Sequence, residues 1–374
     1  MPNYTLQIVS FDNPYPPIYG GVVEVYNKLK PLHNLGIKIH LHCFVTEIPV
    51  DYSELQEVTE NVYFYKTTRN PKDFFSMLPF SVVSRTDKQL LDNLCKIDAP
   101  ILFESLKTTY LVDKDLLPNH RKFLRLHNIE HYYFSGISQS EKNTFKKYLY
   151  KSEALKFVNY ETVISKFEKV FALSIFEQNY TNQKFGNSVY IPVFHGNKKV
   201  AKLTENGKFA FYHGDLRMSD NLKSVKTLIN IFKRIPDVKF VIASSNGQKL
   251  VERMIGGITR IEFVPLQSHD QLLKLLADAH MNVMMSYQQS GTKLKLMASL
   301  YNSRHCIIND NISDDPKVTQ LCHIANTEDE IHEKIQQLKD QPYLDFEKRR
   351  EVLESYLNDD NNAKLLAAEI WNNK

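Results

Sequence analysis

The segment from residue 290 to residue 295, Ser-Gly-Thr-Lys-Leu-Lys, combines small side chains with two lysines. It comes before apolar residues at helical spacing, namely Leu294, Met297, Leu300 and Tyr301. If that helix begins near Gly291, Lys293 and Lys295 lie in its first turn, where cations oppose the helix dipole. A bound diphosphate would reverse that balance, so the segment predicts a phosphate-binding site that includes Ser290, Gly291 and Thr292.

Near the N-terminus, a glycine pair, Gly20 and Gly21, comes directly before the helical pattern VVEVYNKLKPL. Bare backbone N–H groups at a helix N-terminus favour an anion, although such a pair is also ordinary in turns. The pair does not form the GxGxxG pattern, which argues against a standard nicotinamide dinucleotide site.

Two further segments place polar residues directly after expected strands. RLHNIEHYYF carries His127 and Asn128, where a ligand contact is expected, with a structural histidine as an equal alternative. FYHGDLRMSDN carries Gly214, which allows close backbone approach, and Arg217, which suits bidentate pairing with a phosphate. A solvated surface arginine is the equal alternative there.

Short apolar runs alternate with longer amphipathic stretches along the whole chain, and this alternation restarts in the second half. The pattern predicts an α/β protein with buried parallel sheets, in two doubly wound Rossmann-like domains. Their predicted bounds are 1–196 and 197–342, followed by a helical tail over 343–374 that packs back on the N-terminal domain. The expected strands are 6–11, 37–45, 62–65, 101–104, 123–127, 170–174 and 189–191 in the first half, and 209–214, 239–244, 260–264, 282–286, 306–309 and 321–325 in the second. A helical pattern also covers about 138–168.

Composition narrows the class of protein. The formal net charge of the 374-residue chain is +4, which does not indicate a nucleic-acid partner. The 4 cysteines are far apart, so buried thiols in a reducing compartment are expected instead of disulfides or a zinc site. The N-terminal residues lack a signal-peptide pattern, and no run is long enough to span a membrane. These features predict a cytoplasmic protein.

Taken in order, these motifs resemble the GT-B glycosyltransferases, in particular the large retaining family (group 1 type) that uses nucleotide sugars. The similar segments cover nearly the whole chain and include YPPIYGGVVEVYNKLKPLHNLGIKIHLHCF, RLHNIEHYY, FYHGDLRMSDN and GTKLKLMASLYNSRHCIIND. The resemblance implies two domains facing a cleft, with the donor nucleotide mainly on the C-terminal domain and the acceptor on the N-terminal one.

The resemblance also implies roles for individual residues. Arg217 and Lys293 would neutralise the departing diphosphate without a metal or other cofactor, and His127 would hydrogen-bond a hydroxyl of the donor sugar. No protein nucleophile is expected, because the family retains anomeric configuration without an obvious one. The remaining donor contacts would come from Gly20, Gly21, Asn128, Gly214, Ser290, Gly291, Thr292 and Lys295.

One departure from the family pattern concerns two glutamates, which fall here at Ser290 and Ala298. The inner glutamate normally holds both ribose hydroxyls, and its loss forfeits hydrogen bonds of roughly 1.5–3 kcal/mol each. Ser290 and Ser299 are weaker substitutes. The contacts to the phosphates are therefore expected to be present, and the contacts to the ribose and the sugar to be altered.

Three functions remain open at this point. The first is a hexosyltransferase that acts on a saccharide or lipid-linked glycan in polysaccharide biosynthesis. The second is a non-catalytic GT-B-like protein that binds a partner enzyme or a glycan, and the third is an epimerase. Residues 142–157 carry lysines among apolar residues, which predicts peripheral contact with the inner face of the membrane or, alternatively, a solvated helix face.

Overall fold

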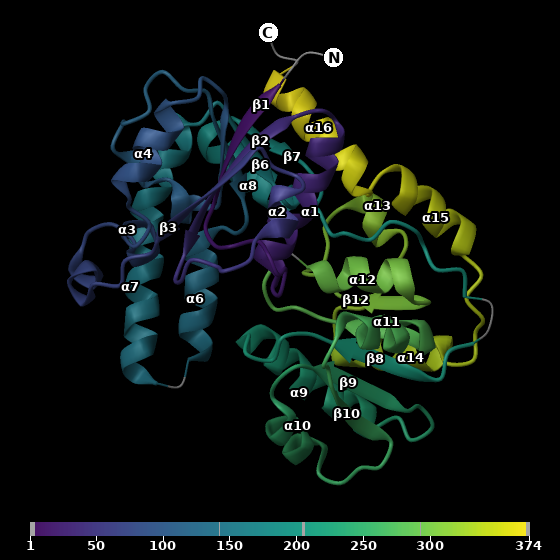
Figure 1. Cartoon of the computed structure of the whole chain (residues 1–374). Coiled ribbons are helices and arrows are strands. Elements are labelled where there is room, and N and C mark those ends of the chain that lie inside the picture. The colour runs from purple at the N-terminus through teal and green to yellow at the C-terminus, as the bar shows by residue number, and fades with distance from the viewer. Residues whose placement is uncertain (1–3, 142, 204–205, 292, 372–374) are drawn as a thin grey trace. The chain divides into compact units, whose positions relative to one another are not determined.

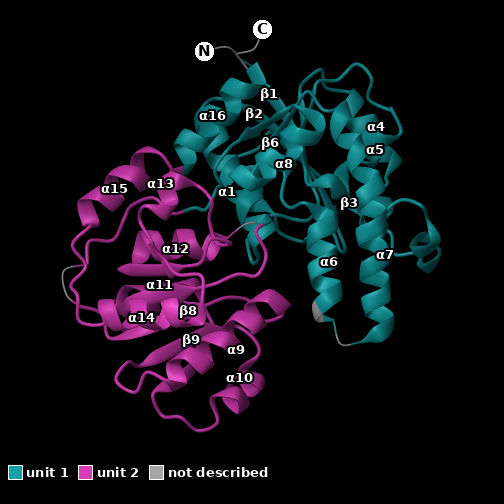
Figure 2. Cartoon of the chain, turned by 180° about the vertical axis from the view of Figure 1, so that it is seen from behind, with its two compact units in different colours: residues 1–196, 290–292, 359–374 teal, residues 197–289, 293–358 magenta. Residues whose placement is uncertain are grey.

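The computed structural model describes residues 4–141, 143–203, 206–291 and 293–371, and the fold is shown in Figure 1. Two compact units divide the chain (Figure 2). Unit 1 contains residues 1–196, 290–292 and 359–374, and unit 2 contains residues 197–289 and 293–358. Within the described ranges, no helix has the length and apolar character needed to cross a membrane.

A seven-stranded parallel sheet forms the centre of unit 1, in the order β3-β2-β1-β4-β5-β6-β7. The chain moves outward from β1 to β3 and then returns to place β4 on the other side of β1. The strand order therefore reverses between β1 and β4, which makes that point the switch point of the sheet. The strands are β1 (Thr5–Ser10), β2 (Lys38–Val45), β3 (Asn61–Lys66), β4 (Ile101–Glu104), β5 (Lys122–Leu126), β6 (Lys169–Ala172) and β7 (Ser188–Tyr190).

Helices cover both faces of this sheet. Alternate residues of each strand are therefore buried in two separate cores. Ile8 packs in one core and Val9 in the other, as the period of two in a strand requires. The helices of unit 1 are α1 (Gly20–Asn34), α2 (Ser53–Gln56), η1 (Pro71–Phe75), α3 (Phe80–Val83), α4 (Lys88–Cys95), η2 (Leu106–Thr108), α5 (Tyr110–Asp113), α6 (Glu130–Ser140), α7 (Thr144–Tyr160), η3 (Glu161–Lys166), α8 (Ile175–Phe185) and α16 (Asp359–Trp371).

The C-terminal helix α16 packs against α1 in unit 1. Ala363, Leu366 and Ile370 are buried in the same core as Leu29 and Leu32 of α1. Near its end, Trp371 stacks on Tyr4, with the ring centroids 4.5 Å apart. The preceding helix α15 (Phe346–Ser355) belongs to unit 2, so the tail expected over 343–374 is divided between the two units.

Unit 2 contains a six-stranded parallel sheet in the order β10-β9-β8-β11-β12-β13, and its switch point lies between β8 and β11. The strands are β8 (Phe209–His213), β9 (Phe240–Ser244), β10 (Ile261–Pro265), β11 (Ala279–Met284), β12 (His305–Ile308) and β13 (His323–Ile324). The other helices of unit 2 are α9 (Ser219–Lys233), α10 (Gln248–Ile255), α11 (His269–Asp278), α12 (Leu294–Asn302), α13 (Pro316–Thr319) and α14 (Glu328–Leu338). The α/β class predicted from the sequence is confirmed.

Three local expectations were wrong. The helical stretch expected over 138–168 is interrupted, because Asn143 accepts a hydrogen bond from the Lys146 N–H and starts α7 as a new helix. Helix α12 begins at Leu294 instead of near Gly291, so Lys293 is its N-cap residue and only Lys295 lies in the first turn. Cys95 is exposed although buried thiols were expected, and all four cysteines are free.

Candidate functional site

The predicted residues of unit 1 gather near the switch point of its sheet. Glu104 ends β4, and His127 follows β5, which is the next strand of the sheet. Gly20 and Gly21 open α1, which follows β1. A Cβ atom on Gly21 would lie 2.6 Å from the Phe11 ring, and that ring in turn meets His127 edge-on at 5.2 Å. The bare backbone at Gly21 therefore allows Phe11 to pack between α1 and His127.

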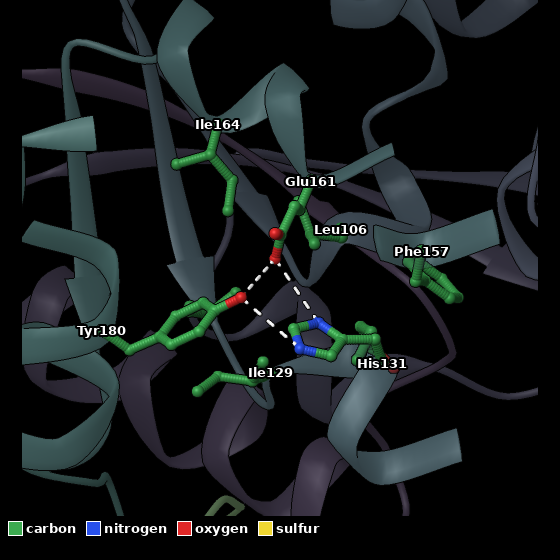
Figure 3. A pocket seen from close by; sticks show the side chains of 9 residues that line it. Leu106, Ile129, His131, Phe157, Glu161, Ile164 and Tyr180 are labelled. Atoms are coloured by element: carbon green, nitrogen blue, oxygen red, sulfur yellow. Dashed lines mark hydrogen bonds and ion pairs between the residues drawn. The ribbon is translucent and has the colours of Figure 1, made fainter. Parts of the chain in front are cut away.

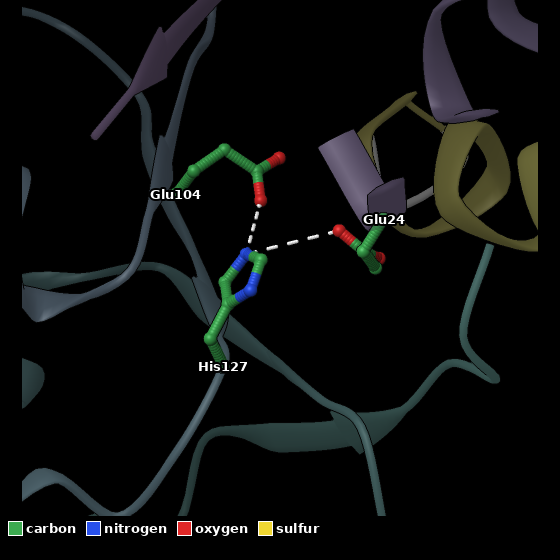
Figure 4. A group of neighbouring side chains, drawn as sticks. All are labelled: Glu24, Glu104 and His127. Atoms are coloured by element: carbon green, nitrogen blue, oxygen red, sulfur yellow. Dashed lines mark hydrogen bonds and ion pairs between the residues drawn. The ribbon is translucent and has the colours of Figure 1, made fainter. Parts of the chain in front are cut away.

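His127 is held by a carboxylate that the sequence analysis did not single out. Its Nε2 atom lies 2.7 Å from Glu104 Oε2 and 3.7 Å from Glu24 Oε2, as Figure 4 shows. Its Nδ1 atom is buried and has no hydrogen-bond partner among the described residues. A neutral imidazole that donates Nε2–H to Glu104 leaves a lone pair on Nδ1. His127 can then accept a hydrogen bond, provided that the donor reaches this buried atom.

Two cations balance these carboxylates. Lys28 Nζ contacts Glu24 Oε2 at 3.0 Å and also contacts Glu104. Arg125 Nε donates to Glu24 Oε1 at 2.8 Å, and its two Nη atoms donate to backbone carbonyls. Burial raises the pKa of Glu24, but the charges of Arg125 and Lys28 outweigh it and lower this pKa to about 2.

The same three side chains have the spacing of a metal site. Glu24, Glu104 and His127 each offer a ligand atom, and these atoms lie within 4.8 Å of one another. Both carboxylates, however, already contact the ammonium of Lys28, and Glu24 also contacts the guanidinium of Arg125. A divalent ion would have to enter beside two fixed positive charges. The chemistry therefore fits a buried ion-pair network better than a metal centre.

Residues 290 and 291 also belong to unit 1, where they contact a second unforeseen carboxylate, Glu177 of α8. Glu177 Oε1 accepts from Ser290 Oγ at 2.8 Å and from the Gly291 N–H at 3.0 Å. Ser290 Oγ also accepts from the Ile129 N–H. Gly291 has φ +97°, and a Cβ there would lie 2.7 Å from Asn128 Oδ1. Thr292 lies outside the described residues.

The remaining predicted residues lie in unit 2 near its own switch point. Gly214 follows β8, and Lys295 lies in the first turn of α12, the helix after β11. Lys295 Nζ donates to Asn221 Oδ1 at 3.0 Å and sits 4.9 Å from the Tyr212 ring centroid. Burial, together with the charge of Lys293, lowers the pKa of Lys295 to about 7. Among the described residues, Lys295 has no carboxylate in ion-pair contact.

Arg217 differs from Lys295 because it already has a carboxylate partner. Its Nε and Nη2 atoms donate to Asp215 at 2.7–3.1 Å, and its side chain is 70% exposed. This pairing with Asp215 raises the pKa of Arg217. A phosphate that binds Arg217 must therefore approach its outer edge or displace Asp215.

Ala298, one of the two positions that replace the expected glutamates, and its neighbour Ser299 both face the interior of unit 2. Ala298 packs against the core that contains Phe211, Leu276 and Ala279. Ser299 is buried, and its hydroxyl donates to Asn282 Oδ1 at 3.2 Å, so it points into the core. Neither residue can hold a ribose in this arrangement.

One polar cluster in unit 1 is too closed for a sugar (Figure 3). His131 Nδ1 lies 3.4 Å from Glu161 Oε2, and Tyr180 Oη donates to the same oxygen at 2.8 Å. The cavity beside them has a volume of about 10 Å³, which admits at most one water molecule. Although His131 belongs to the RLHNIEHYYF segment, its role is structural.

Sequence reasoning missed Glu24, Lys28, Glu104 and Glu177, although a signal existed for some of them. Glu24 and Lys28 stand four residues apart within the apolar stripe Val22, Val25, Leu29 and Leu32 of α1, so they face the core. Glu104 ends an otherwise apolar strand. Charged residues at such positions require partners, and apart from the Glu24–Lys28 pair these partners are distant in sequence.

Two parallel-sheet units, each with a switch point, are the arrangement of the GT-B class of fold. Solved structures agree. The sucrose-phosphate synthase of Thermosynechococcus elongatus is similar with a TM-score of 0.69 at 13% identity, covering 98% of each chain. A glycosyltransferase from Rickettsia africae gives 0.66 at 15% identity over 100% of both chains. A structure described as trehalose-6-phosphate from E. coli, bound with UDP-2-fluoro glucose, gives 0.65 at 9% identity over 98% of each chain.

The chain therefore has the GT-B fold, as its resemblance to that class predicted. Comparisons of its sequence with curated proteins and with protein-family models say less about its class. A curated relative from Klebsiella pneumoniae, described as an uncharacterized 44.6 kDa protein in the cps region, is 25% identical over 313 residues, which are 79% of this chain and 80% of the relative. No protein-family model matches the chain.

Proposed function

We propose that the protein is a glycosyltransferase that moves a sugar, by default a hexose, from a nucleotide-sugar donor to a saccharide or lipid-linked glycan, with retention of configuration. The observation that carries the proposal is the half-buried lysine at the start of α12. Lys295 is desolvated enough to lower its pKa to about 7 and has no carboxylate partner among the described residues. An anionic ligand would supply the missing negative charge.

In this reaction, Lys293, Lys295 and Arg217 neutralise the charge that develops on the departing diphosphate. Because these side chains supply positive charge when the diphosphate is bound, we propose that no metal ion or other cofactor is needed. His127 accepts a hydrogen bond from a donor-sugar hydroxyl through Nδ1, while Glu104 fixes its orientation. We place the reaction in polysaccharide biosynthesis, on the cytoplasmic side of a membrane.

A thermal-shift panel with UDP, GDP, ADP and their sugar conjugates tests the proposal. One nucleotide at about 100 times its Kd should raise Tm by roughly 5–10 °C, with and without EDTA. Lys293→Ala should abolish the shift, because it removes a phosphate contact. Lys226→Ala is the matched control, since Lys226 is an exposed lysine of α9 in the same unit.

A second function is favoured by one observation, the packing of Ala298 into the core. Without a carboxylate for the ribose, the same fold can serve as a non-catalytic protein that binds a partner enzyme or a glycan. The absence of a Tm shift with every nucleotide would support that function. If the nucleotide still raises Tm in the Lys293→Ala and Arg217→Ala variants, it binds at a site that does not include these two residues.

We further propose that α7 rests on an anionic membrane surface. The helix exposes Phe145, Tyr148 and Leu155 (69%, 70% and 61% exposed). Its exposed lysines include Lys147 and Lys151. Helix α7 lies beside α6 in Figure 1. Apolar side chains beside lysines are the pattern of an interfacial helix.

A neighbouring turn extends this surface. Lys156 Nζ of α7 donates to the Phe74 carbonyl at 2.9 Å, and Glu153 accepts from the Phe80 N–H. These bonds hold η1 and the start of α3 against α7. Phe75 of η1 is 90% exposed, so it adds a large apolar side chain to the same part of unit 1.

The double variant Phe145→Ser/Leu155→Ser should weaken binding to phosphatidylglycerol vesicles by about ten-fold or more, because two apolar side chains no longer insert. Vesicle co-sedimentation measures the effect, with phosphatidylcholine vesicles as the neutral comparison. Leu344→Ser is the control, since Leu344 is an exposed leucine of unit 2. Equal binding of the wild type to both vesicle types would overturn the proposed contact.

A further inference from the structure

A cavity of about 260 Å³ opens in unit 1 at the carboxyl ends of three adjacent strands. Asp12 follows β1, Thr46 follows β2, and Arg69 lies just beyond β3. Ser81 and Arg85 complete this wall from α3 and the residues after it. Ligands of open parallel sheets bind at this edge, so the cavity lies where a substrate of unit 1 is expected.

The guanidinium of Arg85 is fixed in this cavity by uncharged partners. Its Nε donates to the Phe11 carbonyl at 2.9 Å, and its Nη1 donates to the Ser81 carbonyl at 2.8 Å and to Ser84 Oγ at 3.3 Å. Burial lowers the pKa of Arg85, although the charge of Asp12 opposes this. A guanidinium that is partly desolvated and lacks an ion-pair partner favours an anion.

Arg69 provides a second cation without a carboxylate partner. Its Nη2 donates to Thr46 Oγ1 at 3.3 Å, and neither Arg69 nor Arg85 forms an ion pair in the part of the chain that the structure describes. Two guanidinium groups at one cavity can bind a carboxylate or a phosphate through paired hydrogen bonds.

The rest of the lining suits a sugar. Asp12 accepts from Tyr19 Oη at 2.6 Å and keeps further acceptor capacity for a hydroxyl. The apolar part of the wall is formed by Phe11, Phe44 and Phe80. Its hydroxyl groups come from Ser81 and Thr67. Apolar surface with a few polar groups is the usual composition of a small-molecule pocket.

We propose that this cavity binds an acidic sugar, with its anionic substituent on Arg69 and Arg85 and a hydroxyl on Asp12, and that it is the acceptor subsite. The acceptor role rests on the proposed glycosyltransferase function, whereas anionic-sugar binding in the cavity does not. The shared chemistry is one anionic group on a hexose-sized ring. A hexuronic acid and a sugar phosphate both provide it.

The test measures binding by the full-length chain without nucleotide, so its failure is distinct from failure of donor binding. Methyl glucuronide, glucose 6-phosphate and methyl glucoside are titrated separately and followed by saturation-transfer difference NMR. At least one acidic sugar should bind about ten-fold or more tightly than the neutral glucoside. The comparison of methyl glucuronide with glucose 6-phosphate shows whether the site prefers a carboxylate or a phosphate.

Arg85→Met should remove this preference and leave binding of the neutral glucoside unchanged. Because Arg85 also ties α3 to Phe11, Arg69→Met provides a second variant whose side chain makes one hydrogen bond in the described structure. Arg253→Met, on the exposed side of α10, is the matched control. Equal affinities for acidic and neutral sugars, no binding of any of them, or a preference that survives both pocket variants would overturn the assignment.

Discussion

Replacing Lys28 with methionine is expected to lower the free energy of unfolding of unit 1 by about 3–5 kcal/mol, because it leaves a buried carboxylate without its cation. Lys28 is fully buried, and it contacts both Glu24 and Glu104. Without its ammonium, Glu24 still contacts Arg125, but Glu104 has no permanent positive charge in contact among the described residues. The side chain of methionine fills most of the volume, so the loss is electrostatic and not a cavity effect.

Denaturant unfolding followed by tryptophan fluorescence measures this loss in the relevant unit. The chain contains 1 tryptophan, and Trp371 lies in α16 of unit 1, stacked on Tyr4. Its signal therefore reports unit 1 separately from unit 2, which matters because a chain with two units need not unfold in one step. Lys364→Met, at an exposed position of the same helix, should change stability by less than about 0.5 kcal/mol.

A charge-balanced double variant separates the ion pair from other effects. Lys28→Met combined with Glu104→Gln removes one charge of each sign, so it should cost less than the sum of the two single variants. Additive losses would contradict a shared network. A loss below about 1 kcal/mol for Lys28→Met alone would show that the ammonium is not buried as the structure places it.

The fold was predictable from the sequence because buried parallel strands leave a strong local pattern. Runs such as ILFE at 101–104 and FAFYH at 209–213 coincide with β4 and β8 within a residue. Helix boundaries depended on weaker signals. A single capping side chain, Asn143, separates α6 from α7, and the pattern of apolar residues continues across that break.

The site was only partly predictable, because its partners are far apart in the sequence. Lys28 and Glu104 are 76 residues apart, and Ser290 and Glu177 are 113 residues apart. Strand and helix patterns place each residue at the correct end of its element, but they do not pair the residues. The phosphate-binding site expected at 290–295 illustrates this limit. Ser290 and Gly291 contact Glu177 of unit 1, while Lys295 contacts Asn221 of unit 2.

Nucleotide binding to unit 2 is expected to take up nearly one proton at pH 8 and almost none at pH 6. The pKa of Lys295 is lowered to about 7 in the free protein, so this side chain is mostly neutral at pH 8. A bound diphosphate favours the ammonium and raises that pKa. His213 does not contribute in this range, because burial and the charge of Lys295 lower its pKa to about 3. The affinity should therefore be greatest below pH 7 and fall by up to about ten-fold per pH unit above it.

Isothermal titration at pH 8 in HEPES and in Tris measures the proton uptake, since the observed enthalpies differ by the protons exchanged with each buffer. Phosphate groups of the nucleotide titrate near pH 6 and are already ionised at pH 8. Lys295→Met should abolish the uptake and, if the protein is an active transferase, lower kcat/KM by about 10²–10³-fold. Lys226→Met, an exposed lysine of α9, should leave both unchanged. Tight nucleotide binding with the same enthalpy in both buffers would show that the diphosphate does not contact Lys295.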